Sequence, residues 1–352
     1  MKINIILSSI GNSGGINVIY KYVDLLVKEG NDVIVYKEVF LPDMHRYNSR
    51  LINKVHQTYR IFKVIPEIFS HRNKCDQFVL HIDDAHIREA DVTIATTWVT
   101  AFKVNQLSIS KGKKFYFIQG FEVWDNEELG KQSYRLPLNK IVVSSWINNQ
   151  LKMNLDMGPF PIVYNGLDLD IYHEIDCEKK VGGRINFLML NHRLPQKGVI
   201  QGLKVFEEVQ KKYPKSHLIM FGLEEADNLP DYVEYHKAPS QNELVNLYSK
   251  SDIFIFPSLE EGWGLTPIEA MACGCVVVGT KTGFVLDLGV HEKNMMISKP
   301  DDIVEMVSNI EKIIQDPDLY NQLKTNGIQA VKKLQWEKSV EKLLRLLNED
   351  NA

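Results

Sequence analysis

The sequence of 352 residues has little cysteine and no long apolar run. Its four cysteines (Cys75, Cys177, Cys273 and Cys275) are scattered apart from one C-x-C pair, which excludes a disulfide framework and the C-x-x-C spacing of zinc or redox sites. We expect buried, inert thiols. No stretch approaches the roughly 18 apolar residues of a membrane-spanning helix, and the apolar start is too short for a signal peptide. We therefore expect a cytoplasmic protein.

Several binding motifs are also missing. The ten histidines show no H-E-x-x-H or comparable spacing, so we expect no metal, and only His192 falls near the site proposed below. The chain has neither the G-x-G-x-x-G fingerprint nor a P-loop lysine. Its net charge is −4, from 41 basic and 45 acidic residues, and it lacks the usual nucleic-acid-binding motifs. Nucleic acid is therefore not an expected partner.

The sequence does contain alternating strand and helix patterns, and its length suits two domains. Short runs rich in Ile, Val and Phe alternate with longer amphipathic segments, which indicates βαβ units and parallel sheets. The predicted strands are 2–9, 32–37, 78–82, 91–96, 114–119, 140–144 and 162–164, then 185–190, 217–221, 252–257, 275–279 and 295–298. The predicted class is therefore α/β, with two doubly wound domains in series.

Domain boundaries follow from a polar stretch that contains Gly182-Gly183. We predict a first domain at 1–170, a linker at 171–184, a second domain at 185–335, and a closing amphipathic helix at 336–352. Each doubly wound sheet offers a ligand crevice at the carboxyl ends of its strands.

Three segments carry polar chemistry at such strand ends. Gly14-Gly15 precede a helix, and backbone amides at a helix start suit an anion, although a plain tight turn is the alternative. Arg193 and Lys197 follow a strand and could neutralise a diphosphate, unless they are solvated surface charges. In residues 256–274, Pro267 predicts the first turn of a helix that includes Glu269, with Glu261 in the preceding loop. Together, hydrogen-bond donors for a phosphate and hydrogen-bond acceptors for sugar hydroxyls are the groups expected in a nucleotide-sugar pocket.

Glu261 and Glu269, seven residues apart within EGWGLTPIEAMACG, resemble the E-x7-E motif of retaining glycosyltransferases of family 4, which have the GT-B fold. The resemblance extends over nearly the whole chain, through Gly14-Gly15, residues 165–168, Lys197-Gly198 and Trp336. It implies two Rossmann-like domains facing each other across a cleft, with the C-terminal helix returning to the first domain. It also implies sugar transfer with retention, without a metal or other cofactor.

The resemblance also implies roles for individual residues. Glu269 would accept hydrogen bonds from ribose hydroxyls, and Glu261 would hold a hydroxyl of the donor sugar. Arg193 and Lys197 would stabilise the departing diphosphate. Backbone amides would assist them at Gly14, Gly15, Gly264, Leu265 and Thr266. The donor is then a nucleoside-diphosphate sugar, with UDP favoured and GDP or dTDP as alternatives.

Two departures from the family pattern affect these roles. Many members space the Arg and Lys one residue further apart than Arg193 and Lys197, so one cation is expected to be displaced. Many members carry a His where this chain has Gln119, which cannot act as a general base. Its context is similar to that of bacterial surface-polysaccharide transferases, some of which use deoxysugar donors. Candidate acceptor-side residues are Gln119, Glu122, Thr97 and Trp98, with core packing the alternative for Thr97 and Trp98.

Residues 44–74 hold seven basic residues and one acid, interleaved with apolar side chains. The pattern fits either a helix on an anionic membrane surface or a core-facing stripe with a solvated basic face. We expect transfer of a hexose or deoxyhexose to a glycan or lipid-linked saccharide at the inner face of the bacterial membrane, in lipopolysaccharide or capsule synthesis. The alternatives are a nucleotide-sugar epimerase on the same fold and a non-catalytic partner of another transferase.

Overall fold

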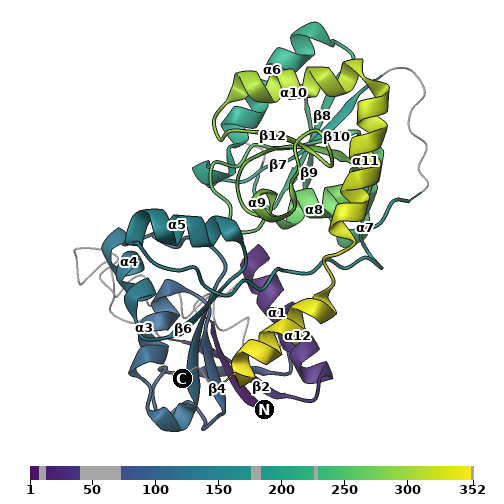
Figure 1. Cartoon of the computed structure of the whole chain (residues 1–352). Helices are drawn as coiled ribbons and strands as arrows, with labels where there is room; N and C mark the ends of the chain where they lie inside the picture. The colour runs from purple at the N-terminus through teal and green to yellow at the C-terminus, as the bar shows by residue number, and fades with distance from the viewer. Residues whose placement is uncertain (8–12, 40–72, 176–183, 226–228, 350–352) are drawn as a thin grey trace. The chain divides into compact units, whose positions relative to one another are not determined.

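The computed structural model describes residues 1–7, 13–39, 73–175, 184–225 and 229–349 (Figure 1). The chain divides into two compact units. Unit 1 comprises Met1–Val143, Ile147–Tyr164 and Glu337–Ala352, and unit 2 comprises Ser144–Trp146 and Asn165–Trp336. The expected return of the C-terminal helix to the first domain is confirmed, because α12 (Trp336–Asn348) belongs to unit 1 from its second residue onward.

Unit 1 is built around one parallel sheet with the strand order β3-β2-β1-β4-β5-β6. Besides α12, its elements are β1 (Lys2–Leu7), α1 (Gly14–Lys28), β2 (Asp32–Glu38), β3 (Asp76–Val79), β4 (Val92–Ala95), α3 (Trp98–Gln106), η1 (Ile109–Lys111), β5 (Lys113–Ile118), α4 (Glu127–Arg135), β6 (Asn139–Val142) and α5 (Ser145–Leu155). Helices lie on both sides of the sheet (Figure 1). The doubly wound prediction is therefore confirmed for this unit.

Unit 2 repeats the arrangement, with the order β12-β11-β10-β7-β8-β9. Its elements are β7 (Asn186–Leu190), η2 (Pro195–Lys197), α6 (Val199–Lys212), β8 (His217–Gly222), β9 (Val233–Lys237), α7 (Gln241–Lys250), β10 (Ile253–Phe256), α8 (Leu265–Ala272), β11 (Val276–Thr280), α9 (Val285–Leu288), β12 (Met296–Ser298), α10 (Ile303–Gln315) and α11 (Pro317–Val331). In both sheets the first strand of the unit is central, and the strand order reverses beside it.

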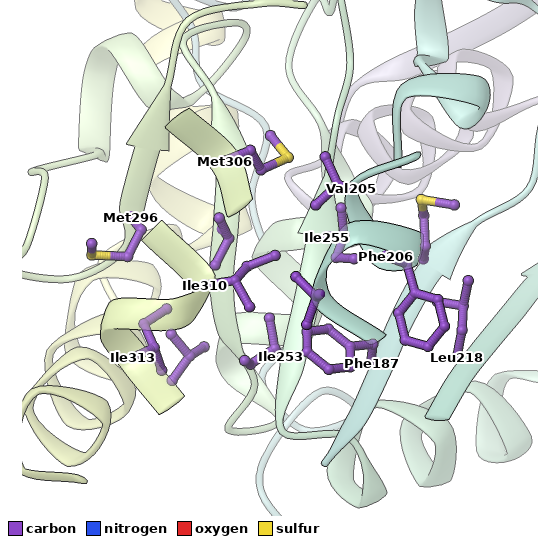
Figure 2. Packing of buried hydrophobic residues seen from close by; sticks show 14 of the residues in the cluster. Phe187, Val205, Phe206, Leu218, Ile253, Ile255, Met296, Met306, Ile310 and Ile313 are labelled. Atoms are coloured by element: carbon purple, nitrogen blue, oxygen red, sulfur yellow. The ribbon is translucent and has the colours of Figure 1, made fainter. Parts of the chain in front are cut away.

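The core of unit 2 explains why its strands lack polar alternation. β10 and β11 are buried along their whole length, as expected for strands covered on both faces. On one face, Phe187 and Ile255 pack against Phe206 of α6 and Ile310 of α10 (Figure 2). Burying each such side chain contributes roughly 1.5–3 kcal/mol. This packing fixes the strand ends from which the functional loops emerge.

Three strand predictions differ from the structure. The strand expected at 78–82 is β3 at Asp76–Val79, because the chain turns away where Leu80 becomes exposed. Residues 162–164 contribute only an isolated bridge between Val142 and Ile162. β9 was not predicted, because its sequence VEYHK is polar and none of its residues is fully buried at the sheet edge. The described helices include none that is both long and apolar enough to cross a membrane.

Candidate functional site

In unit 2 the polar residues gather where the strand order reverses. β7 and β10 are neighbouring parallel strands, so the loops that follow them leave the same edge of the sheet. One loop carries Lys197, and the other carries Glu261. Ligands of doubly wound sheets bind at this position.

Backbone contacts hold the two loops together. The amide of Leu259 donates a hydrogen bond to the carbonyl oxygen of Gln196 at 2.8 Å. Gly198 has a φ of +65°, and a Cβ at this position would lie only 2.0 Å from the carbonyl oxygen of Pro257. The glycine is therefore required both by its left-handed backbone and by the close approach of the second loop.

This arrangement joins Lys197 to Glu261. The Lys197 Nζ lies 2.6 Å from the Glu261 Oε2, and both side chains are mostly buried. The Ser258 hydroxyl lies 3.5 Å from the same carboxylate oxygen. A cation and a carboxylate are thus side by side at the strand ends.

Arg193 is placed differently. Its side chain is 78% exposed, and its Nε lies 3.5 Å from the Glu224 carboxylate rather than pairing with Glu261. The displacement of one cation from a diphosphate, expected from the short Arg–Lys spacing, stays a prediction. Nearby, burial lowers the pKa of His192, and the charge of Lys197 lowers it further, so the imidazole is neutral at pH 7.

Glu269 lies in α8, and Glu261 lies in the preceding loop, as predicted. The Tyr248 hydroxyl donates to the Glu269 Oε2 at 2.9 Å. Burial raises the pKa of Glu269 to about 7, while hydrogen bonds from Tyr248 and Tyr172 lower it. The carboxyl group is thus poised between its two protonation states at neutral pH, and it has hydrogen-bond acceptor capacity beyond these two phenols.

The start of α8 suits an anion. Gly264 precedes the helix with a φ of +94°, and no side chain caps it. The first amides of the helix, at Leu265 and Thr266, therefore lack the side-chain acceptor that most helix starts have. Gly264 lies three residues after Glu261, so this end of the helix continues the loop that carries Glu261.

In unit 1, Gly14 and Gly15 are the first two residues of α1 rather than the turn before it. The hydroxyl of Ser13 caps the helix by accepting a hydrogen bond from the Ile16 amide at 3.3 Å. A Cβ on Gly15 would lie 3.6 Å from the Gln119 Nε2, so the end of β5 and the start of α1 meet here. Two of the predicted residues are therefore adjacent.

The other acceptor-side candidates also meet in unit 1. The Trp98 amide, at the start of α3, donates to the Glu122 Oε2 at 2.7 Å, and the Tyr116 hydroxyl donates to the same oxygen at 3.1 Å. Thr97 caps α3 in a capping box with Thr100. Burial raises the pKa of Glu122 to about 7, against the lowering effect of its two donors. Trp98 is buried, as the core alternative for this residue expected.

The remaining observations concern a cavity in unit 2, metal binding, the basic segment and the cysteines. An open cavity of about 770 Å³ in unit 2, lined by residues such as Tyr172, Ala272 and Lys324, contains none of them. Among the residues with described placement, no group of three or more His, Cys, Asp or Glu side chains could hold a metal ion. Most of the basic segment 44–74 lies outside the described residues. Cys273 and Cys275 are buried, as predicted.

The partners of the two buried carboxyl groups were not predicted. Tyr248 and Tyr172 lie 21 and 97 residues from Glu269 in the sequence. No sequence signal distinguishes a tyrosine that donates to a buried carboxylate from one that only packs in the core.

Residues 174–330 match the family model described as "Glycosyl transferases group 1". These residues are therefore similar to group 1 glycosyl transferases. The matched segment covers most of unit 2, and it includes Arg193, Lys197, Glu261 and Glu269.

Curated relatives agree with the domain match over parts of their length. An uncharacterized glycosyltransferase from Methanocaldococcus jannaschii is 27% identical over 207 residues, which cover 57% of this chain and 56% of the relative. The serotype-specific mannosyltransferase WbdA from Escherichia coli is 32% identical over 97 residues, which cover 28% of this chain and 12% of the relative. The chain thus spans about half the length, or less, of the curated relatives it matches.

Solved structures resemble the whole chain in fold. Sucrose-phosphate synthase from Thermosynechococcus elongatus aligns with a TM-score of 0.72 and 15% identity, covering 98% of each chain. HepE from Anabaena, in complex with UDP-glucose, aligns with a TM-score of 0.71 and 14% identity, covering 99% of each chain. These likenesses support the two-unit α/β fold, which is the GT-B class expected from the sequence.

Proposed function

We propose that the protein is a retaining glycosyltransferase that moves a hexose or deoxyhexose from a nucleoside-diphosphate sugar to a hydroxyl of a glycan or lipid-linked saccharide. The observation that carries the proposal is the pairing of Lys197 with Glu261 at the strand ends of unit 2, beside the uncapped start of α8. The family match over the same residues and the UDP-glucose bound to HepE support it. UDP is the favoured nucleotide, with GDP or dTDP as alternatives.

The geometry suggests how the reaction would proceed. Cleavage of the donor's glycosidic bond places negative charge on the diphosphate, and a preorganised cation and helix amides stabilise such charge without reorganisation. Lys197 and the amides of Leu265 and Thr266 supply these groups. On donor binding, Glu261 would exchange Lys197 for a sugar hydroxyl, while Glu269 would accept from the ribose. Retention follows if the acceptor hydroxyl oxygen bonds to the anomeric carbon from the face that the diphosphate leaves, with the hydroxyl proton passing to the departing diphosphate oxygen.

The proposed setting is bacterial surface-polysaccharide synthesis, such as lipopolysaccharide or capsule, at the cytoplasmic face of the membrane. WbdA, described as serotype-specific, supports this setting, and so does the context of Gln119. Gln119, Glu122 and Thr97 are assigned to the acceptor side in unit 1.

The test is calorimetric titration of the full chain with UDP, GDP, dTDP and CDP. We expect one nucleotide to bind and the Glu269→Ala variant to weaken it by about tenfold to a hundredfold, the range for hydrogen bonds to a charged group. Glu208→Ala, on the exposed surface of the same unit, is the matched control. Binding of none of the four contradicts the proposal. The anomeric configuration of the product, read by NMR with the bound donor, then tests retention, and an isomerised sugar released without acceptor would indicate the epimerase.

A further inference from the structure

Trp124 differs from every other tryptophan in the chain. The other four, Trp98, Trp146, Trp263 and Trp336, are 3–8% exposed, whereas Trp124 is 45% exposed. Exposed indoles forgo a large transfer free energy, so an exposed one on an ordered surface calls for a reason beyond folding. Trp124 lies in the loop between β5 and α4, which leaves the carboxyl edge of the unit 1 sheet, where ligands of such sheets bind.

The loop that carries Trp124 is held rigidly. The Glu122 amide donates to the Tyr134 hydroxyl at 2.5 Å, and the Glu122 carboxylate is fixed to the start of α3. A Cβ on Gly130 of α4 would lie 2.6 Å from the Glu122 carbonyl oxygen, so α4 packs directly on the loop. Asp125, next to Trp124, adopts a φ of +64°, which costs free energy for a residue with a side chain. The exposed indole is therefore presented on a preorganised backbone.

The surroundings of Trp124 combine aromatic rings with carboxylates. Its ring packs edge-to-face against Trp98, with centroids 5.6 Å apart. The buried Trp98 Nε1 has no hydrogen-bond partner among the residues that the structure describes. The acidic residues Asp125, Glu127 and Glu128 follow within four positions in the sequence. In α4 the Glu127 carboxylate pairs with the Lys131 Nζ at 2.5 Å, and the Glu128 carboxylate accepts a hydrogen bond from the Gln132 side chain at 3.1 Å. Both carboxylates keep further acceptor positions for ligand hydroxyls.

We propose that Trp124 is the stacking platform of a saccharide-binding site on unit 1, so that the acceptor is a pre-existing sugar ring rather than a simple alcohol. This inference rests on the proposed function. A pyranose ring presents weakly positive C–H groups on one face, which suit the negative face of an indole, and it presents hydroxyls at its edge, which suit carboxylates.

The experiment uses Trp124 as its own reporter, because it is the exposed indole. Iodide quenching of the full chain is measured with maltotriose, mannotriose, cellotriose and chitotriose at millimolar concentrations, and separately with vesicles containing anionic phosphatidylglycerol. We expect at least one trisaccharide to protect the fluorescence. Calorimetry with that sugar should show affinity roughly tenfold or more weaker in Trp124→Ala and within about threefold of wild type in Trp124→Phe.

UDP titration of the same variants separates this inference from the proposed function. UDP binding that is unchanged in Trp124→Ala, together with the loss of trisaccharide binding, supports the site. Protection by vesicles alone, failure of all four trisaccharides, or equal sugar affinity in Trp124→Ala overturns it, even where UDP binds. Failure of every nucleotide to bind contradicts the proposed function instead. Ile109→Ala, at another exposed apolar residue of unit 1, is the matched control for general surface effects.

Discussion

The two units share one strand order but differ in what they place at the carboxyl edge. Unit 2 gathers Lys197, Glu261 and the start of α8, which are groups suited by their chemistry to an anion and its attached hydroxyls. Unit 1 gathers Trp98, Glu122 and Trp124, to which we assign a saccharide ring in the proposal above. Each unit also holds one carboxyl group whose pKa is raised to about 7. The comparison teaches that the shared sheet topology determines where a ligand site can form, whereas the loop residues determine which chemical groups line that site.

The largest expected effect follows from removing the unit 2 cation. Lys197→Ala should lower kcat for sugar transfer by about a hundredfold to a thousandfold, the range for one preorganised charge-stabilising group. The readout is sugar released or transferred from a donor that carries the nucleotide found to bind by calorimetry. Lys211→Ala, which removes an exposed lysine of the same unit, should leave kcat unchanged. A loss of kcat of less than about threefold in Lys197→Ala would show that this residue does not stabilise the transition state.

A second comparison between the units concerns the stability effects of two glycines at helix starts, Gly198 in unit 2 and Gly14 in unit 1. Gly198→Ala should lower the free energy of unfolding by about 3 kcal/mol, because the left-handed backbone is strained and the added Cβ would collide with the Pro257 carbonyl. Gly14→Ala, where a Cβ meets nothing within 4 Å, should change it by less than about 1 kcal/mol. Urea denaturation monitored by circular dichroism measures both. Equal effects would contradict the assigned role of Gly198.

The two raised carboxyl pKa values predict how stability depends on pH. Between the ordinary Glu value of 4.5 and about 7, the folded protein binds more protons than the unfolded chain. The contribution of these two groups to stability is therefore greatest below this window and is lost as pH rises through it. Glu122→Gln and Glu269→Gln should each reduce the decrease of the unfolding free energy with pH. The double variant should nearly abolish the part of the decrease that these two carboxyl groups cause. Urea midpoints measured across the window test this, and a slope unchanged in both variants would contradict the raised values.

The smallest expected effect compares the two buried phenols. Tyr248→Phe and Tyr116→Phe each remove one donor to a buried carboxyl oxygen, and each should cost about 1 kcal/mol of unfolding free energy above pH 7. The cost should shrink at lower pH, where the carboxyl groups are protonated. Tyr213→Phe, at a more exposed phenol, is the control. Nucleotide affinity should fall in Tyr248→Phe only, and an equal fall in both variants would mean that the nucleotide site is not confined to unit 2.

The sequence predicted the sheet pattern well because buried parallel strands, such as 253–256, are continuous apolar runs between turn residues. It placed Glu261 and Glu269 in the right local elements for a similar reason, since Pro267 and Gly274 mark the ends of α8. β9 was missed because a polar edge strand has no such run.

The partners of the site residues could not be predicted in the same way. The Lys197–Glu261 pair and the phenols around Glu269 join residues far apart in the sequence, and they depend on which strands are neighbours. Trp124 gave no signal, because an exposed and a buried tryptophan look alike in a single sequence.

The Lys197–Glu261 ion pair also affects how a donor reaches the site. Because the lysine charge is already balanced by a carboxylate 2.6 Å away, this pair projects little net field into solution. For the diphosphate donor proposed above, this pair would therefore give little long-range attraction, and capture would depend on short-range exchange of the Glu261 carboxylate for the phosphate. The association rate for the nucleotide should consequently vary little with ionic strength, unlike that of proteins that steer their ligands with an uncompensated charge.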